Sequence, residues 1–210
     1  MTTYQDVLGV VLAGGLSRRM GQDKAWLEID DEALVCQTAS RLKSQCSKVV
    51  VSTNGDISRF QSLGLSVVTD PYPDFRGPMA GILAAMDWAA NQQPSAQWVA
   101  SIAVDTPFFP DNFVSKLHEA CRENSLNIAA ASSGGRSHPV NALWALSLRS
   151  QIRQYLSGKP GKVSLWMEQN GARFVEWGTE PFDPFTNINT PQDLEEARLL
   201  TSRFYKLGRK

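Results

Sequence analysis

The sequence carries no excess of charge and few residues of the kinds that build metal or disulfide frameworks. Its 21 basic side chains balance 21 acidic ones. Without a global positive field there is no long-range attraction for nucleic acid, so we expect no nucleic-acid partner and only local anion sites. The three cysteines, Cys36, Cys46 and Cys121, include no Cys-x-x-Cys pair. This spacing argues against structural zinc and favours free thiols in a cytoplasmic protein.

Long apolar runs are also missing. The run near the N-terminus, from Val7 to Ala13, ends in glycines and is far shorter than the roughly 20 residues of a membrane span. The residues before it are polar, unlike a signal peptide, so we expect no membrane partner. Only His118 and His138 are histidines. His118 is expected to face solvent from a helix, and His138 is expected to lack the serine or carboxylate partner that a catalytic triad needs.

Short β-branched runs alternate with helical patterns in the first half of the chain. Right-handed crossovers between such runs build a mostly parallel sheet, so we predict a three-layer α/β/α, Rossmann-like fold. Asp31 is predicted to cap the first helix. The predicted strands cover residues 7–12, 48–52, 65–68 and 97–104, and the predicted helices cover residues 31–45, 57–63, 79–91 and 110–123.

The second half predicts one antiparallel strand. Strands at 128–132 and 140–145 are separated only by a glycine-containing loop, 134–139, which is too short for a crossover helix. Thr190 is expected to cap a final helix, with Pro191 and Asp193 in its first turn. We further predict helices at 146–156 and 163–170 and a strand at 173–177. Trp144, Trp166 and Trp177 are expected in the core. The chain is expected to form one domain over 1–201, followed by a basic tail over 202–210.

The first predicted strand leads into a loop rich in glycine and basic residues, Gly14 to Lys24. Glycines let backbone N–H groups approach an anion, and arginine and lysine add charge. The loop lacks Gly-x-Gly-x-x-Gly, and Ala25 follows Lys24 where a P-loop has serine or threonine. It therefore predicts a phosphate site of another kind, or else a tight turn with exposed basic residues.

Ligands of parallel sheets bind beyond the carboxyl ends of the strands. That rule selects a set of post-strand residues: Gly14, Gly15, Asn54, Asp70 and Asp105. The carboxylate of Asp105 suits Mg²⁺ together with substrate phosphates, although an Asx-turn before Pro107 would also explain it. Arg76 precedes a predicted helix start, which fits either phosphate binding or a helix start fixed by Pro78.

The segment from Leu12 to Lys24 resembles the signature of the nucleotidyltransferases that have a Rossmann-like domain. Three further segments resemble one branch, the molybdenum cofactor guanylyltransferases: Asp70–Gly81, Asp105–Pro110 and Asn187–Pro191, with the pair His138-Pro139 as a shorter match. The resemblance covers nearly the whole chain. It implies GTP as donor, molybdopterin or molybdenum-loaded molybdopterin as acceptor, Mg²⁺ as cofactor, and contact with cofactor-delivery proteins.

The resemblance also implies roles for individual residues. The N-terminal half would bind the nucleotide and the C-terminal half the acceptor. Arg19, Lys24 and Asp105 would be catalytic, with Asp105 also holding the metal. The nucleotide would contact Leu12, Ala13, Gly14, Gly15, Arg19, Lys24, Asn54, Asp70, Gly81 and Asp105, and the acceptor would contact His138, Lys162, Asn187 and Asn189.

Two alternatives remain at this point. One is a related nucleotidyltransferase that uses CTP with molybdopterin or acts on a sugar or alditol phosphate. The other is a nucleotide-binding delivery protein without turnover. Base preference separates the first from a guanylyltransferase, and pyrophosphate release separates the second.

Overall fold

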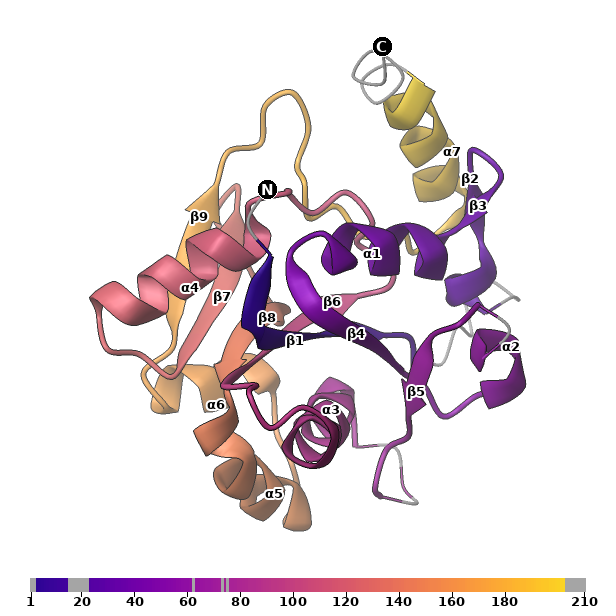
Figure 1. Ribbon diagram of the computed structural model, residues 1–210. Coiled ribbons are helices and arrows are strands. Elements are labelled where there is room, and N and C mark those ends of the chain that lie inside the picture. The colour runs from indigo at the N-terminus through magenta and orange to yellow at the C-terminus, as the bar shows by residue number, and fades with distance from the viewer. Residues whose placement is uncertain (1–2, 15–22, 62, 73, 75, 203–210) are drawn as a thin grey trace.

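The computed structural model describes residues 3–14, 23–61, 63–72, 74 and 76–202. Its centre is a sheet with the strand order β5-β4-β1-β6-β8-β7-β9 (Figure 1). In this sheet β8 is antiparallel to both β6 and β7, and the other neighbouring pairs are parallel, as predicted. The strands are β1 (Tyr4–Leu12), β4 (Cys46–Ser52), β5 (Ser66–Val68), β6 (Trp98–Ala103), β7 (Ile128–Ser133), β8 (Arg136–Ala145) and β9 (Arg173–Trp177).

Helices cover both faces of the sheet, which gives the predicted three layers. Figure 1 shows α1 and α4 on one face and α3, α5 and α6 on the other. The side chains of β1 alternate between the two layers, with Val7 and Val11 in one apolar cluster and Leu8 and Val10 in the other. The helices are α1 (Leu34–Lys43), α2 (Ile57–Gln61), α3 (Pro78–Gln92), α4 (Phe113–Glu123), α5 (Arg149–Ser157), α6 (Val163–Gln169) and α7 (Pro191–Leu200).

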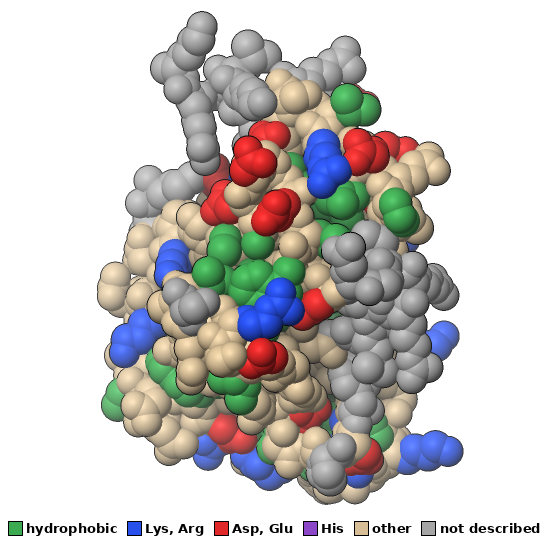
Figure 2. Space-filling model, turned by 90° about the vertical axis from the view of Figure 1, so that its right-hand side faces the viewer, with side chains coloured by type: hydrophobic (Ala, Val, Ile, Leu, Met, Phe, Trp, Pro, Cys, Tyr) green, Lys and Arg blue, Asp and Glu red, His purple; other side chains and the backbone are tan. Residues whose placement is uncertain are grey.

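The last helix, α7, lies against a small hairpin formed by β2 (Glu28–Ile29) and β3 (Glu32–Ala33). Its start is the predicted one: Thr190 and Asp193 form a reciprocal capping box, with Pro191 in the first turn. Figure 2 shows acidic side chains gathered on the face that includes α7 and the hairpin. Leu194 and Ala197 of α7 are buried, whereas Glu195 and Glu196 are exposed, so the helix has an apolar and a charged side.

Two local predictions were wrong. Asp31 does not cap a helix: Asp30 and Asp31 form the turn of the β2–β3 hairpin with φ values of 52° and 61°, and α1 begins only at Leu34. An N-cap needs an extended backbone, which these residues lack. The predicted loop at 134–139 is mostly strand, because Gly134 and Gly135, with φ values of 54° and 75°, reverse the chain by themselves. His138 therefore lies in β8 and not in a loop.

The predicted exposure of His118 was also wrong. The side chain is buried in α4, and its ring packs 4.8 Å from the Tyr4 ring and 5.7 Å from the Trp98 ring. Burial lowers the pKa of His118, although the nearby Asp6 carboxylate acts in the opposite direction. The core positions predicted for three tryptophans are confirmed: Trp144, Trp166 and Trp177 are all buried.

No helix in the described part of the chain is long and apolar enough to cross a membrane.

Candidate nucleotide-binding site

A pocket of about 300 Å³ opens at the carboxyl ends of the central parallel strands. Its position agrees with the rule for ligand sites in such sheets. It is lined by Leu12, Ala13, Gly14, Asp23, Lys24, Ser52, Thr53, Asn54, Asp70, Gly77, Pro78, Gly81, Ala103, Val104, Asp105, Val140 and Asn187. The structure therefore brings together most of the nucleotide-site residues that the sequence selected.

The wall of the pocket at the end of β1 is made of main chain. The Ala13 N–H donates to the Ser52 carbonyl at 2.8 Å, and the Val104 N–H donates to the Leu12 carbonyl at 3.1 Å. These bonds extend the main-chain pairing of β1 with β4 and β6 to the end of β1 at Leu12 and beyond it. Gly14 follows directly and lines the pocket without a Cβ. Gly15 and Arg19 lie outside the described residues.

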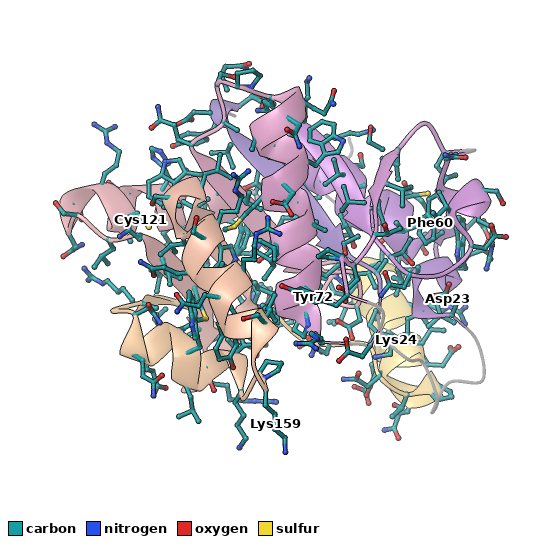
Figure 3. All side chains as sticks on the ribbon, turned by 90° about the horizontal axis from the view of Figure 1, so that it is seen from below. Asp23, Lys24, Phe60, Tyr72, Cys121 and Lys159 are labelled. Atoms are coloured by element: carbon teal, nitrogen blue, oxygen red, sulfur yellow. The ribbon has the colours of Figure 1, made fainter. Side chains whose placement is uncertain are left out.

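Lys24 is held by a single 3₁₀ turn, Lys24–Trp26. Asp23 caps this turn by accepting a hydrogen bond from the Ala25 N–H at 3.1 Å. The Trp26 ring then packs 5.1 Å from the ring of Phe60 in α2. Figure 3 shows Asp23 and Lys24 on this turn, with Phe60 beside it. The turn fixes where the lysine stem leaves the backbone.

The ammonium group of Lys24 joins two segments that are far apart in the sequence. It lies 2.9 Å from Oδ2 of Asp105 and donates to Oδ1 of Asn189 at 2.5 Å. The Lys24 and Asp105 side chains are only 19% and 17% exposed, so solvent screens this pair less than a surface ion pair. One cation, one carboxylate and one amide thus meet at the rim of the pocket.

Asp105 follows β6, and its neighbours attach the 187–189 segment to the end of this strand. The Ile188 N–H donates to the Asp105 carbonyl at 2.9 Å, and the buried Thr106 hydroxyl donates to Oδ1 of Asn187 at 3.0 Å. Asn187 lines the pocket, while Asn189 reaches Lys24. The two asparagines therefore reach the site from a loop that returns to the sheet edge just before α7.

The side chain of Asn54 holds the main chain of Asp70, and both residues line the pocket. Oδ1 of Asn54 accepts from the Asp70 N–H at 2.9 Å, and Oδ1 of Asp70 accepts from the Tyr72 N–H at 2.9 Å. The first bond occupies the carbonyl side of the Asn54 amide. The NH₂ group of Asn54 is therefore its donor toward further partners.

The N-terminus of α3 forms the floor of the pocket. Gly77 has a φ of 75°, which favours glycine, and Pro78 starts the helix. A Cβ at Gly81 would lie 2.4 Å from Oγ of Ser52 and 3.1 Å from Cδ2 of Leu12, so this glycine permits close packing of α3 on the sheet. The 15-residue helix directs a partial positive charge toward the pocket.

Arg76 does not line this pocket. Its guanidinium donates to the carbonyls of Leu156 and Gly158 at the C-terminus of α5, and it lies 4.8 Å from the centre of the Tyr72 ring. It also pairs with the exposed Asp74, which raises the pKa of Arg76. Arg76 thus caps α5 and links the segment before α3 to the second half of the chain.

Two of the residues predicted for the acceptor side also lie outside the lining. His138 is half-buried in β8 and stacked 5.1 Å from the Phe185 ring. The expectation that it lacks a serine partner was wrong, because the β7–β8 hairpin brings Ser133 within 2.8 Å of its Nε2. Lys162 is exposed at the N-cap of α6. The second half contributes Asn187 and Val140 to the pocket and Asn189 to its rim.

Several lining residues were not singled out from the sequence. Asp23 had a readable signal, because an aspartate before Lys24 can cap a turn. Ser52 and Thr53 directly precede Asn54 at the end of a strand, so the strand-end rule covers them too. Val140 had no such signal, since it reaches the pocket only because the antiparallel β8 crosses the strand ends.

Among the described residues, no three His, Cys, Asp or Glu side chains cluster closely enough to bind a metal by themselves. The described carboxylates that line the pocket are those of Asp23, Asp70 and Asp105, and Asp105 is the one paired with Lys24. Mg²⁺ usually binds one or two carboxylates together with substrate phosphates and water. The donor set therefore fits a metal that arrives with a phosphate ligand.

A Rossmann-like sheet with a lysine, a carboxylate and a helix N-terminus around one pocket defines a nucleotide-binding α/β protein. Residues 9–173 match the MobA-like NTP transferase domain family, so the chain belongs to this family and is a nucleotidyltransferase. It is 44% identical over 196 residues to a molybdenum cofactor guanylyltransferase of Nitrobacter hamburgensis, covering 92% of this chain and 94% of that protein. A Bradyrhizobium relative with the same description is 42% identical over 203 residues, covering 96% of each chain.

Solved structures share the fold. Molybdopterin-guanine dinucleotide biosynthesis protein A from Archaeoglobus fulgidus has a TM-score of 0.74 at 21% identity, covering 94% of this chain and 100% of that one. A 4-diphosphocytidyl-2C-methyl-D-erythritol synthase from Anaerococcus prevotii has a TM-score of 0.71 at 11% identity, covering 94% and 96%. At these identities the likeness concerns the fold alone.

Proposed function

We propose that this protein transfers GMP from GTP to the terminal phosphate of molybdopterin, free or molybdenum-loaded. The products are the guanine dinucleotide form of the cofactor and pyrophosphate. The observation that carries the proposal is the meeting of Lys24, Asp105 and Asn189 at the rim of the pocket. The relatives named as molybdenum cofactor guanylyltransferases support the choice of donor and acceptor.

On the donor side, we assign the guanosine to the wall formed by Leu12, Ala13 and Gly14, with Asn54, Asp70 and Gly81 completing the nucleotide contacts. The NH₂ group of Asn54 suits an acceptor atom on a base or ribose. We assign the triphosphate to Lys24 and to the loop that contains Gly15 and Arg19. The partial positive charge at the start of α3 favours an anion in the same place.

We assign Mg²⁺ to Asp105, where the carboxylate and the phosphates of the nucleotide together would supply its ligands. When bound, the ion stabilises negative charge on the phosphates. Lys24 is paired with Asp105 in this structure. In the proposed role the same ammonium group contacts the phosphate oxygens, and its bond to Asn189 limits the directions in which it can point.

In the reaction, an oxygen of the acceptor phosphate forms a bond to the α-phosphorus of GTP as the bond from that phosphorus to the pyrophosphate oxygen breaks. The electron pair of the broken bond leaves with pyrophosphate, whose charge Lys24 stabilises. A phosphate monoester is largely ionised at neutral pH, so the attack needs no protein base. Positioning and charge neutralisation provide the catalysis.

On the acceptor side, Asn187 and Asn189 stand at the pocket rim and are assigned to the incoming pterin. Lys162 is exposed outside the pocket, and we assign it to the anionic acceptor on the strength of the sequence resemblance. We further propose that residues 1–201 act as one domain in the cytoplasm and pass the product to delivery proteins. The free state of Cys36, Cys46 and Cys121 fits a reducing compartment.

Pyrophosphate release tests the proposal directly. The protein is mixed with Mg²⁺, molybdopterin and GTP, CTP, UTP or ATP in turn, and pyrophosphate is measured with and without molybdopterin. We expect release with GTP only when molybdopterin is present. Release with CTP in place of GTP would indicate a cytidylyltransferase. Release that depends on a sugar or alditol phosphate, and not on molybdopterin, would indicate that related class of nucleotidyltransferase. GTP binding without pyrophosphate release would indicate a delivery protein.

A further inference from the structure

Three side chains form a hydrogen-bonded row between β8, β7 and the loop before α7. Nε2 of His138 lies 2.8 Å from Oγ of Ser133, and the Ser133 hydroxyl donates to Oδ1 of Asp183 at 2.7 Å. Ser133 is completely buried. A fully buried hydroxyl cannot contact a substrate, so Ser133 can act only through its two hydrogen-bond partners.

The directions of these hydrogen bonds follow from the chemistry of the hydroxyl. A serine has one hydrogen to donate, and a carboxylate oxygen can only accept. Since Ser133 donates to Asp183, its oxygen accepts from His138, which must carry a hydrogen on Nε2. The row therefore runs from the imidazole N–H through the hydroxyl to the carboxylate.

Asp183 shapes the segment that follows it. The same oxygen, Oδ1, accepts from the Phe185 N–H at 2.9 Å, and the Asp183 carbonyl accepts from both the N–H and the hydroxyl of Thr186, at 3.2 and 3.0 Å. These bonds form a tight turn. The residues directly after it are the ones that reach the pocket, and Asn189 is bonded to Lys24.

We propose that His138 is a positioning residue, which acts through Ser133 and Asp183 to hold segment 183–189 so that Asn189 orients the Lys24 ammonium. The inference rests on the proposed GMP transfer and differs from the acceptor contact that the sequence resemblance implied for His138. One end of the segment is fixed by the row, and the other meets the ion pair of Lys24 and Asp105.

The surroundings of His138 favour this role over an ionic contact with the acceptor. Its ring stacks on Phe185 at an interplanar angle of 27°, and its Nε2 is already engaged by Ser133. The charged groups that face it are Asp183, Arg136 and Glu176. Burial lowers the pKa of His138, so the ring contributes a hydrogen bond and an apolar face at neutral pH rather than a charge.

Four variants test the inference in the pyrophosphate assay. Ser133→Ala removes the link and His138→Phe removes the donor while keeping a ring on Phe185, whereas His138→Gln keeps a donor near the Nε2 position. Ser132→Ala removes the same atom from the adjacent buried residue, for which the described residues provide no hydrogen-bond partner. We expect kcat to fall about tenfold in Ser133→Ala and His138→Phe, since a displacement of about 1 Å can cost roughly 100-fold.

The same experiment separates positioning from acceptor contact. We expect the KM for molybdopterin to change little, His138→Gln to recover most of kcat, and Ser132→Ala to match the wild type. An unchanged Ser133→Ala variant would overturn the inference, as would a His138→Phe variant altered only in the KM for molybdopterin. If the wild type itself releases no pyrophosphate, the proposed function fails, and the inference that rests on it fails too.

A measurement on the wild type covers the case in which a variant does not fold. The ¹⁵N shifts of the His138 ring report which nitrogen carries the hydrogen. We expect the Nε2–H tautomer at neutral pH. The Nδ1–H tautomer would show that His138 does not donate a hydrogen bond to Ser133 and would contradict the inference.

Discussion

The two halves of the molecule place their polar groups in different ways. In the first half, Gly14, Asn54, Asp70 and Asp105 each come two residues after the end of a parallel strand, so the sheet itself brings them to one edge. In the second half, Asn187 and Asn189 come from a long loop, and side-chain hydrogen bonds hold them in place. The first arrangement depends on backbone ladders, and the second depends on a few individual side chains.

This difference has an energetic consequence. Strand ends are held by many cooperative hydrogen bonds and buried apolar contacts, so one substitution there seldom moves the backbone. A loop held by three or four side chains is displaced more easily, because each bond is a large share of what fixes it. We therefore expect substitutions in the first half to act on the chemistry directly and those in the second half to act through position.

The largest effect is expected at the ion pair. Lys24→Ala and Asp105→Asn should lower kcat by at least about 100-fold. The first removes a positive charge that stabilises the phosphates in the transition state, and the second removes the negative charge assigned to holding Mg²⁺. Asp105→Asn keeps an oxygen for Lys24, so the fold should survive. The measurement is pyrophosphate release, with far-ultraviolet circular dichroism to check the fold.

Asp111→Asn is the matched control for these variants. Asp111 forms an ion pair of similar length with Arg41, 3.0 Å, but it is not part of the nucleotide pocket. Its activity should equal that of the wild type. A Lys24→Ala enzyme with near wild-type kcat would contradict the role assigned to the pair of Lys24 and Asp105.

Gly81→Ala should act on both packing and nucleotide binding. The added methyl would lie 2.4 Å from Oγ of Ser52, which outweighs the gain in helix propensity, so we expect a loss of about 1–3 kcal/mol in the free energy of unfolding. Urea unfolding measures this loss, and GTP affinity should fall with it. At Gly178, where a Cβ meets nothing within 4 Å, the same change should be nearly neutral. Equal stability of the two variants would show that α3 does not pack as described.

Arg76→Ala should loosen the connection between the halves without affecting the nucleotide pocket. Loss of the cap should speed amide hydrogen exchange at the C-terminal turn of α5, near Tyr155 to Gly158, while exchange in β1 stays unchanged. The KM for molybdopterin should rise by a few-fold more than the KM for GTP. Arg149→Ala is the control, because Arg149 pairs with Asp87 of α3 from the N-terminal end of α5 and does not contact the C-terminal turn that Arg76 caps. A larger change for GTP than for molybdopterin would contradict the separation of the halves.

The smallest effect concerns pH. The pKa of His118 is lowered in the folded protein, chiefly by burial, so the unfolded chain binds more protons as the pH falls through about 6.5. The stabilisation that the neutral ring contributes is therefore present above that pH and is lost as the pH drops. Thermal unfolding at pH 7.5 and pH 5.5 should show a smaller decrease in Tm for His118→Phe than for the wild type. If Tm decreased equally in both proteins between pH 7.5 and pH 5.5, His118 would not be a source of the pH dependence of stability.

The sequence was sufficient for the sheet and for the strand-end residues because both depend on local patterns. Runs of β-branched residues predicted the strands, and positions shortly after these runs predicted Asn54, Asp70 and Asp105 as site residues. Asp31 and His118 were mispredicted because local propensity does not encode the hairpin that uses Asp31 in its turn or the rings that cover His118. Asn187 and Asn189 were found only through resemblance, since no periodicity shows that a loop returns to the Lys24 turn.

The connection between the halves can be tested by combining two substitutions. Asn189→Ala removes the bond to Lys24, and Ser133→Ala loosens the segment that carries Asn189. If the second half acts on Lys24 through this segment, kcat of the double variant should equal that of Asn189→Ala alone within about twofold. Losses that multiply would show that the two residues act independently and that Asn189 does not transmit the position of the loop to the phosphate-binding lysine.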